Sequence, residues 1–444
     1  MDKLLYLVAG LGKTGHAIAN FLRRKNLSFI AFDTRAEVDG IDEFRADFPG
    51  TQVYLQQLPD AIYSKLIQII VSPGVDLRAD FLQRARGLDI EIIGDIECLA
   101  REISAPVIAI TGTNGKSTVT TLVGAMAQAA GLNVIVAGNI GMPVLEQLDP
   151  ECRPDLWVLE LSSFQLDLTY SLNPIAATIL NVTADHLDRH ITMAAYTAAK
   201  QRIYTGAKNI IYNRQDAGTY PQNGENIITI GLDEPPEECH WGIIQQCNDT
   251  YLARGSKCLL SIDNLAIKGT HNWQNALAAC AFATIIGISE QHIISVLTTF
   301  GGLPHRCQLV RSLNQVEWIN DSKGTNVGAT LAAIHGIGTS MTGKIVLIAG
   351  GLGKGADFTA LKQPLENHVR ALILIGEDTE KIATAVAGST MIIKEKSMQD
   401  AVNSAQLCAV AGDTVLLSPA CASFDMFDDF NHRGAAFANL VASL

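Results

Sequence analysis

The stretch from Ala109 to Met126, AITGTNGKSTVTTLVGAM, constrains the fold of this chain more than any other segment. An apolar run typical of a buried strand leads into Gly112-Thr-Asn-Gly115-Lys116-Ser117 and then into a helical pattern. The backbone N–H groups of such a loop can cradle phosphates, the lysine can pair with the β- and γ-oxygens, and the serine hydroxyl can reach Mg²⁺. The usual spacing has a glycine at position 110, where this chain has Ile110. We still expect a triphosphate site, because GKS at a strand–helix junction has little purely structural explanation.

A second glycine loop lies far upstream, in VAGLGKTGHAIANFL. Gly10-x-Gly12-x-x-Gly15 follows a strand-like run and opens a helical one, and Asp33 ends the next strand-like run. In the dinucleotide fingerprint, such glycines let the backbone approach a pyrophosphate while the acid binds a ribose hydroxyl. Alone, the loop favours an NAD enzyme over another nucleotide or a plain tight turn. Two loops imply two phosphorylated ligands, as in an enzyme that uses ATP on a substrate carrying a nucleotide tag.

Strand-like runs alternate with helical runs over most of the 444 residues, which predicts parallel sheets with crossover helices. The length suits roughly three domains. We predict three α/β domains, at residues 1–94, 95–302 and 303–444. The alternation weakens only in the polar segment 213–268, and the turn GGLPHR at residues 301–306 marks the second boundary.

The net charge of −12 gives no electrostatic footprint for nucleic acid or an anionic membrane. An anionic ligand therefore needs local cations. The nine cysteines never occur as CxxC, so neither a disulfide framework nor a zinc knuckle is indicated, and a reducing cytoplasm fits best. No apolar run reaches the roughly 18 residues of a membrane helix.

Candidate metal ligands follow two strand-like runs of the second block. Glu160 ends the run LWVLE, and NVTADHLDRH offers Asp185, His186 and Asp188 after the next one. Ligand sites of open α/β sheets lie at such strand ends, and these groups could hold Mg²⁺ against ATP. Histidine is an unusual ligand for so hard a cation, so a capping or core role stays open for His186. Lys200, in AAYTAAKQRIY, is by residue type alone best explained as a solvated lysine.

The third block carries further charges at strand ends. Arg306, at a predicted domain junction, could reach the γ-phosphate and stabilise its charge during transfer. Asp321 and Lys323 lie between a strand and the helix expected near Thr325, and Lys354 lies in a glycine-rich loop. Such a cluster suits a small acidic substrate, since charge-assisted hydrogen bonds are the strong ones. Solvated loop charges are the alternative.

The motifs GTNGKS, LELSSFQL, ILNVTADHLDRH, AAKQRIY, HNWQNALAA, GLPHR, NDSKGTN and SPACASFDMFDDF together resemble the Mur ligases, in order and along essentially the whole chain. The resemblance is strongest to the D-glutamate-adding type. It implies a Rossmann-like N-terminal domain that binds a UDP-sugar, a P-loop central ATPase domain, and a Rossmann-like C-terminal domain that binds the amino acid.

The resemblance also implies the reaction. ATP phosphorylates the carboxylate of UDP-N-acetylmuramoyl-L-alanine, the amine of D-glutamate attacks the acyl phosphate, and ADP and phosphate leave. ATP and Mg²⁺ are then required, and we expect a cytoplasmic monomer in peptidoglycan synthesis.

Site residues follow from the resemblance position by position. The implied ATP contacts are Gly112, Thr113, Asn114, Gly115, Lys116, Ser117, Thr118, Asn272, Arg306, Asp321 and Lys323. The implied Mg²⁺ ligands are Ser117, Glu160, His186 and Lys200, the last as a carbamate. The implied UDP-sugar contacts are Thr14, Asp33, Thr34, Arg35, Ser72, Gly74 and Asn139. The implied D-glutamate contacts are Thr325, Lys354, Ser423 and Phe430, and the implied catalytic group is Lys116, His186, Lys200 and Arg306.

Three alternatives stay open. The chain could be another Mur-type ligase with a different amino acid, or an NAD(P)-dependent oxidoreductase, which the first glycine loop alone supports. It could also be a nucleotide-sensing protein without catalysis.

Overall fold

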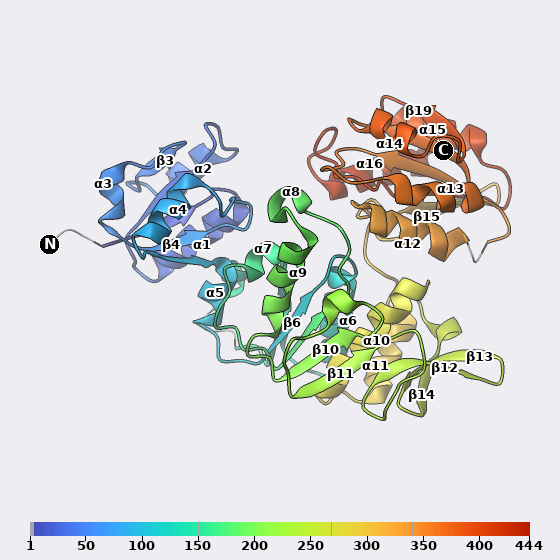
Figure 1. Ribbon diagram of the computed structural model, residues 1–444, viewed down its shortest axis with the longest axis horizontal. Helices are drawn as coiled ribbons and strands as arrows, with labels where there is room; N and C mark the ends of the chain where they lie inside the picture. The colour runs from blue at the N-terminus through green and yellow to red at the C-terminus, as the bar shows by residue number, and fades with distance from the viewer. Residues whose placement is uncertain (1–3, 150, 152, 268, 339–340) are drawn as a thin grey trace.

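The structure is a computed structural model that describes residues 4–149, 151, 153–267, 269–338 and 341–444. It consists of three α/β bodies in chain order (Figure 1). The N-terminal body, in blue, and the C-terminal body, in orange and red, lie on opposite sides of the view, and the central body lies below and between them. Among the described residues, no helix combines the length and the apolar character needed to cross a membrane.

The N-terminal sheet is parallel, in the order β3-β2-β1-β4-β5. Its strands are β1 (Leu5–Ala9), β2 (Phe29–Asp33), β3 (Val53–Leu55), β4 (Leu66–Val71) and β5 (Glu91–Gly94). The helices between them are α1 (Lys13–Arg24), α2 (Ile41–Asp47), α3 (Asp60–Tyr63) and α4 (Asp80–Gly87). Apolar side chains of β1, β2 and β4 fill both faces of the sheet, as a parallel sheet covered by helices requires.

A short helix, α5 (Asp95–Ala100), leads into the central sheet of nine strands, in the order β14-β13-β12-β11-β10-β9-β6-β8-β7. The strands are β6 (Val107–Thr111), β7 (Val134–Gly138), β8 (Leu156–Glu160), β9 (Ala176–Ile179), β10 (Asn209–Asn213), β11 (Asn226–Ile230), β12 (Trp241–Gln246), β13 (Asp249–Arg254) and β14 (Lys257–Ser261). The helices are α6 (Lys116–Ala129), α7 (Ser163–Leu166), α8 (Leu187–His190), α9 (Met193–Gln201), α10 (Thr270–Ile285) and α11 (Glu290–Thr299).

The polar segment predicted to interrupt the alternation forms the far edge of this sheet. Strands β12, β13 and β14 pair antiparallel there, in contrast to the parallel pairs of β6 to β11. Antiparallel strands at a sheet edge can leave one face in water, which explains why their sequences are less apolar.

The C-terminal sheet has the order β15-β16-β20-β17-β18-β19. Its strands are β15 (Gln308–Leu313), β16 (Val316–Asn320), β17 (Ile345–Gly350), β18 (Val369–Ile375), β19 (Met391–Lys394) and β20 (Thr414–Leu417). Its helices are α12 (Val327–Gly338), α13 (Lys362–His368), α14 (Thr379–Ala385), α15 (Met398–Cys408) and α16 (Phe430–Ser443). All pairs are parallel except β15 with β16. The three sheets lie within the three predicted segments, and the domain limits themselves stay predictions.

Candidate functional site

The candidate site residues lie at the carboxyl ends of neighbouring strands in all three sheets. In the central sheet, β6 pairs with both β8 and β9, so the glycine loop after β6, Glu160 at the end of β8 and the segment after β9 share one edge. Ligands of open parallel sheets bind at this edge. Ile110, which departs from the usual loop spacing, is a buried residue of β6, and the loop begins after that strand at Gly112.

The loop Gly112–Ser117 takes a backbone shape that requires its glycines. Gly115 caps α6 with φ +82°, and a Cβ there would lie 2.4 Å from Asn275 Oδ1. Asn181, after β9, holds the loop from the other side: the backbone N–H of Asn114 donates to its Oδ1 at 2.8 Å, and its Nδ2 donates to Asn114 O at 3.1 Å. The N-terminus of α6 is thereby presented as an anion site.

Two lysine side chains converge on one carbonyl of this loop. Lys116 Nζ donates to Gly112 O at 2.8 Å and to Thr113 O at 2.9 Å, and Lys200 Nζ donates to Gly112 O at 2.9 Å. Lys200 is only 2% exposed, so its interpretation as a solvated lysine is wrong. Burial, with repulsion from Lys116, holds the pKa of Lys200 well below its usual value, and burial also lowers the pKa of Lys116.

The residues predicted to hold Mg²⁺ fit a cation in one respect that the structure shows directly. Glu160 is 1% exposed, and its Oε2 makes no hydrogen bond within the described part of the chain, while Asn139 Nδ2 donates to its Oε1 at 3.0 Å. A buried carboxylate oxygen without a partner is costly unless a cation satisfies it. Ser117 and His186, the latter with φ +52° before α8, are the neighbouring candidates at this edge. Asn139, assigned to the UDP-sugar by resemblance, thus contacts a candidate metal ligand.

Arg306 reaches the glycine loop from the third segment of the chain. Its Nη2 donates to Ser117 Oγ at 2.9 Å, and it lines one cavity together with Asn114, Thr118, Asn272, Asp321 and Lys323. Gly115 also lines this cavity, which therefore brings seven of the predicted ATP contacts together. Burial raises the pKa of Asp321 to about 6 and, with repulsion from Arg306, lowers the pKa of Lys323 to about 8.

The first glycine loop lies against β2 and β4 of its own sheet. Asp33 accepts from Leu11 N at 2.9 Å and from Arg35 Nε and Nη2 at 2.9 and 2.8 Å. Burial opposes ionisation of Asp33, but these hydrogen bonds outweigh it and lower its pKa. Ser72 Oγ donates to Gly10 O at 2.9 Å, so the turn after β4 is fixed to this loop. Thr14, in α1, and the exposed residues Thr34 and Gly74 lie on the three segments that meet here.

The predicted D-glutamate contacts follow three adjacent parallel strands, since β20 pairs with both β16 and β17. Thr325 comes after β16, Lys354 after β17 and Ser423 after β20. Lys323 Nζ lies 3.6 Å from the ring centroid of Phe430, the first residue of α16. Lys354 is close enough to the central sheet to lower the pKa of His186, although burial of the imidazole is the larger cause.

Several residues at these edges were not predicted as contacts. Asn326 Nδ2 donates to Asn114 Oδ1 at 3.3 Å and to Asp185 Oδ2 at 3.2 Å, joining the C-terminal segment to the glycine loop. The only feature of the sequence that could have indicated a role for Asn326 is its position at the end of the motif NDSKGTN. Arg189 and Phe164 lie inside quoted motifs, but their contacts depend on how two bodies pack.

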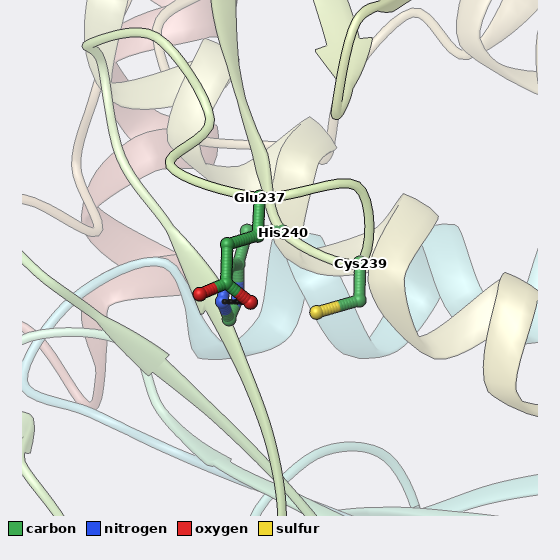
Figure 2. Close-up of side chains that lie close together, drawn as sticks. All are labelled: Glu237, Cys239 and His240. Carbon is green, nitrogen blue, oxygen red and sulfur yellow. Dashed lines mark ion pairs between the residues drawn. The ribbon is translucent and has the colours of Figure 1, made fainter.

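A separate group of possible metal ligands, Glu237, Cys239 and His240, lies in the loop before β12 (Figure 2). The backbone N–H of Thr229 donates to His240 Nδ1 at 2.9 Å, so the neutral ring carries its proton on Nε2. That nitrogen is the one facing Glu237, at 3.9 Å from Oε2. Metal-bound histidines donate their other ring N–H rather than accept there, so this arrangement is better explained as a loop contact.

Comparison with known protein families matches three models to consecutive parts of the chain. The Mur ligase MurD-like N-terminal domain matches residues 5–94, the Mur ligase middle domain residues 110–283, and the Mur ligase glutamate ligase domain residues 305–421.

Two relatives with full-length similarity bear the same name, UDP-N-acetylmuramoylalanine–D-glutamate ligase. The protein of Legionella pneumophila strain Paris is 61% identical over 448 aligned positions, covering 100% of both chains. The protein of Pseudomonas putida is 44% identical and covers 99% of this chain and 97% of its own.

Solved structures share the fold at lower identity. A pseudomurein peptide ligase type C from Methanothermus fervidus has a TM-score of 0.63 at 20% identity, covering 99% of this chain and 100% of its own. The UDP-N-acetylmuramate-alanine ligase MurC from Thermotoga maritima has a TM-score of 0.61 at 15% identity, covering 99% of each chain.

Proposed function

The chain belongs to the Mur ligase family, and from this we propose that it adds D-glutamate to UDP-N-acetylmuramoyl-L-alanine in an ATP-dependent, ADP-forming reaction of peptidoglycan synthesis. The observation that carries the proposal is the full-length identity of 61% with a ligase of that name. The match of residues 5–94 to a Mur ligase N-terminal domain explains the first glycine loop without nicotinamide, which removes the reason for an oxidoreductase.

We infer that ATP binds at the loop Gly112–Ser117. Four features support this: the N-terminus of α6, the cations Lys116 and Arg306, and the cavity that Asn272 helps to line. Glu160, Ser117, His186 and a carbamate on Lys200 would hold Mg²⁺, because the unpartnered Glu160 oxygen calls for a cation. When bound, Mg²⁺ would neutralise charge on the phosphates.

The chain's own residues then have separate tasks. Lys116 and Arg306 stabilise the negative charge on the transferred phosphoryl group, which passes to the substrate carboxylate to give an acyl phosphate. Lys323 and Lys354, at the edge of the C-terminal sheet, bind the carboxylates of D-glutamate and orient its amine. The amine attacks the acyl carbon, the amide forms, and phosphate leaves. A monomer working in the cytoplasm is consistent with this role and stays part of the proposal.

The test is ADP release by the purified protein. With UDP-N-acetylmuramoyl-L-alanine, Mg²⁺ and ATP, we expect ADP with D-glutamate and at least about tenfold less with L-glutamate or meso-diaminopimelate. Lys116→Ala should lower kcat by at least about a hundredfold while the fold is kept. Equal rates with another amino acid would identify a different Mur-type ligase. Absence of ADP with the complete substrate set would refute the proposal.

A further inference from the structure

Arg189 connects two bodies of the molecule across the side where the candidate sites lie. It belongs to α8, a helix of the central body that stands between the N-terminal and C-terminal bodies in Figure 1. Its Nη1 donates to Gly74 O at 3.3 Å, and its Nη2 donates to Pro73 O at 3.4 Å and to Val75 O. One guanidinium therefore binds three consecutive carbonyls of the turn after β4.

That turn is itself packed on the first glycine loop. Ser72 N donates to Ala9 O at 2.8 Å, and the Ser72 hydroxyl donates to the loop carbonyl of Gly10. A Cβ at Gly10 would lie 2.6 Å from Val75 Cγ2. Val75 thus leaves no room for a methyl group at Gly10. The turn and the loop are packed so closely that a displacement of the turn displaces the loop as well.

The same guanidinium group of Arg189 also lies against the edge that carries the candidate metal ligands. Its guanidinium carbon lies 4.5 Å from the ring centroid of Phe164, which belongs to α7, just after Glu160. His186 contacts the same ring edge-on at 5.0 Å, and His190 stacks on it at 5.4 Å with 18° between the planes. The Phe164 ring thus fixes Arg189 relative to His186, one helical turn earlier.

We propose that Arg189 is a positioning residue for the UDP-sugar. It sets the spacing between the loop that binds the nucleotide end of the substrate and the strand edge where its carboxylate reacts. Guanidinium suits this role because its rigid fork donates several hydrogen bonds at once and stacks on an aromatic ring. Since one substrate has to engage both sites at once, the spacing between them affects its binding, and a misplaced reacting group also slows the reaction. The inference rests on the proposed function, because it needs a substrate that spans both sites.

The experiment compares three variants with the wild type. Arg189→Met keeps an unbranched stem but loses all three hydrogen bonds, so we expect the Kd of UDP-N-acetylmuramoyl-L-alanine, measured calorimetrically without ATP, to rise about tenfold. The Kd of ATP should stay within about twofold. Arg189→Lys keeps the charge without the fork, and we expect it to recover only part of the affinity.

Arg78→Met is the matched control. Arg78 is exposed, lies in the same segment and pairs with Asp76, and its described hydrogen bonds stay within the N-terminal body, so its removal takes away one cation from the same surface without breaking a hydrogen bond between the bodies. We expect less than about a twofold change in either Kd.

Four outcomes would overturn the inference. These are unchanged UDP-sugar affinity in Arg189→Met, full recovery in Arg189→Lys, an equal loss in Arg78→Met, or a parallel loss of ATP affinity. The second and third would mean that charge alone acts, and the fourth that the change is a general loss of structure. If Arg189→Met does not fold, Arg189→Lys decides. A wild type that releases ADP with D-glutamate separates failure of this inference from failure of the proposed function.

Discussion

At the residue scale, three basic side chains converge on the loop Gly112–Ser117. Lys116 and Lys200 donate to the same carbonyl oxygen, that of Gly112, and Arg306 donates to the hydroxyl of Ser117, the residue after Lys116. Burial and repulsion from Lys116 favour the neutral amine of Lys200. A neutral amine is the form that can react with carbon dioxide to give a carbamate. The carbamate would place an anion beside Lys116.

This leads to a prediction for Lys200→Ala. We expect kcat to fall by about a thousandfold, because the oxygen proposed to bind the metal is lost. Formate or acetate at high concentration should restore part of the activity, since a free carboxylate can occupy the vacated space. ADP release measures both effects.

The control for this experiment is Lys116→Ala, where the proposed role is that of a cation. Carboxylates should not restore its activity. If methylammonium, and not acetate, rescues Lys200→Ala, then Lys200 acts as a cation and the carbamate is excluded.

At the scale of elements, α5 joins the first two sheets through a buried carboxylate. Glu97 Oε2 accepts from the backbone N–H groups of Tyr170 and Ser171 at 2.7 and 2.9 Å, and its Oε1 accepts from Ser171 Oγ and Arg101 Nε at 2.8 and 2.9 Å. Burial opposes ionisation, but these four donors outweigh it and lower the pKa of Glu97. The linker helix is thereby fixed to the segment after α7.

We predict that Glu97→Gln lowers the free energy of unfolding by about 2–3 kcal/mol, because an amide group would face donors. The folded pKa lies below the unfolded one, so the ionised carboxylate stabilises the fold above the unfolded pKa. This contribution is lost as the pH falls through the folded pKa. The difference between variant and wild type should therefore be full at pH 7 and shrink below about pH 4.

Urea denaturation followed by circular dichroism measures this difference at each pH. Glu102→Gln is the control, because Glu102 forms a partly exposed ion pair with Lys25 and should contribute less than about 1 kcal/mol. A Glu97→Gln difference that does not vary with pH would contradict the electrostatic explanation.

At the scale of the whole molecule, the two interfaces of the central body differ in character. One apolar cluster contains side chains of both the N-terminal and the central bodies, including Val8, Ile18, Leu145 and Trp157. The C-terminal sheet has apolar clusters of its own, formed by residues 307–444. The hydrogen bonds from the C-terminal segment to the loop Gly112–Ser117 are made by polar side chains, those of Arg306 and Asn326. Polar interfaces of this kind permit relative motion, so the C-terminal body is the part expected to move.

We therefore predict closure of the C-terminal body about the turn at residues 301–306, where Gly302 has φ +88°. Closure would bring the amine of D-glutamate to the carboxylate and exclude water. Small-angle scattering should show a smaller radius of gyration with UDP-N-acetylmuramoyl-L-alanine, D-glutamate, Mg²⁺ and a non-hydrolysable ATP analogue.

With the same ligands present, Lys116→Ala should give the scattering curve of the ligand-free protein, because it lacks the cation proposed to bind phosphate. Identical curves for the wild type with and without ligands would contradict the hinge.

The strands that could be predicted from the sequence have a clear pattern within a few neighbouring residues, and the strands that could not be predicted lack one. Strands β1, β6, β17 and β20 were predicted because each is a buried apolar run ended by glycine, proline or a polar loop. Strand β3 has only three residues and β15 is an antiparallel edge strand with exposed positions, so neither shows a clear pattern. Most of the predicted site residues come from the resemblance to the Mur ligases. Their roles concern bound ligands, so contacts between protein residues do not test these roles.

Local sequence patterns were enough to predict the three α/β segments and the position of both glycine loops at strand ends. This was possible because apolar runs and glycine conformations act over a few neighbouring residues. Only the tertiary structure decided that Lys200 is buried beside Lys116, that Arg306 reaches Ser117, and that Arg189 binds a turn of another body. These contacts join residues far apart in the chain, and they depend on how sheets and helices pack, which no local pattern encodes.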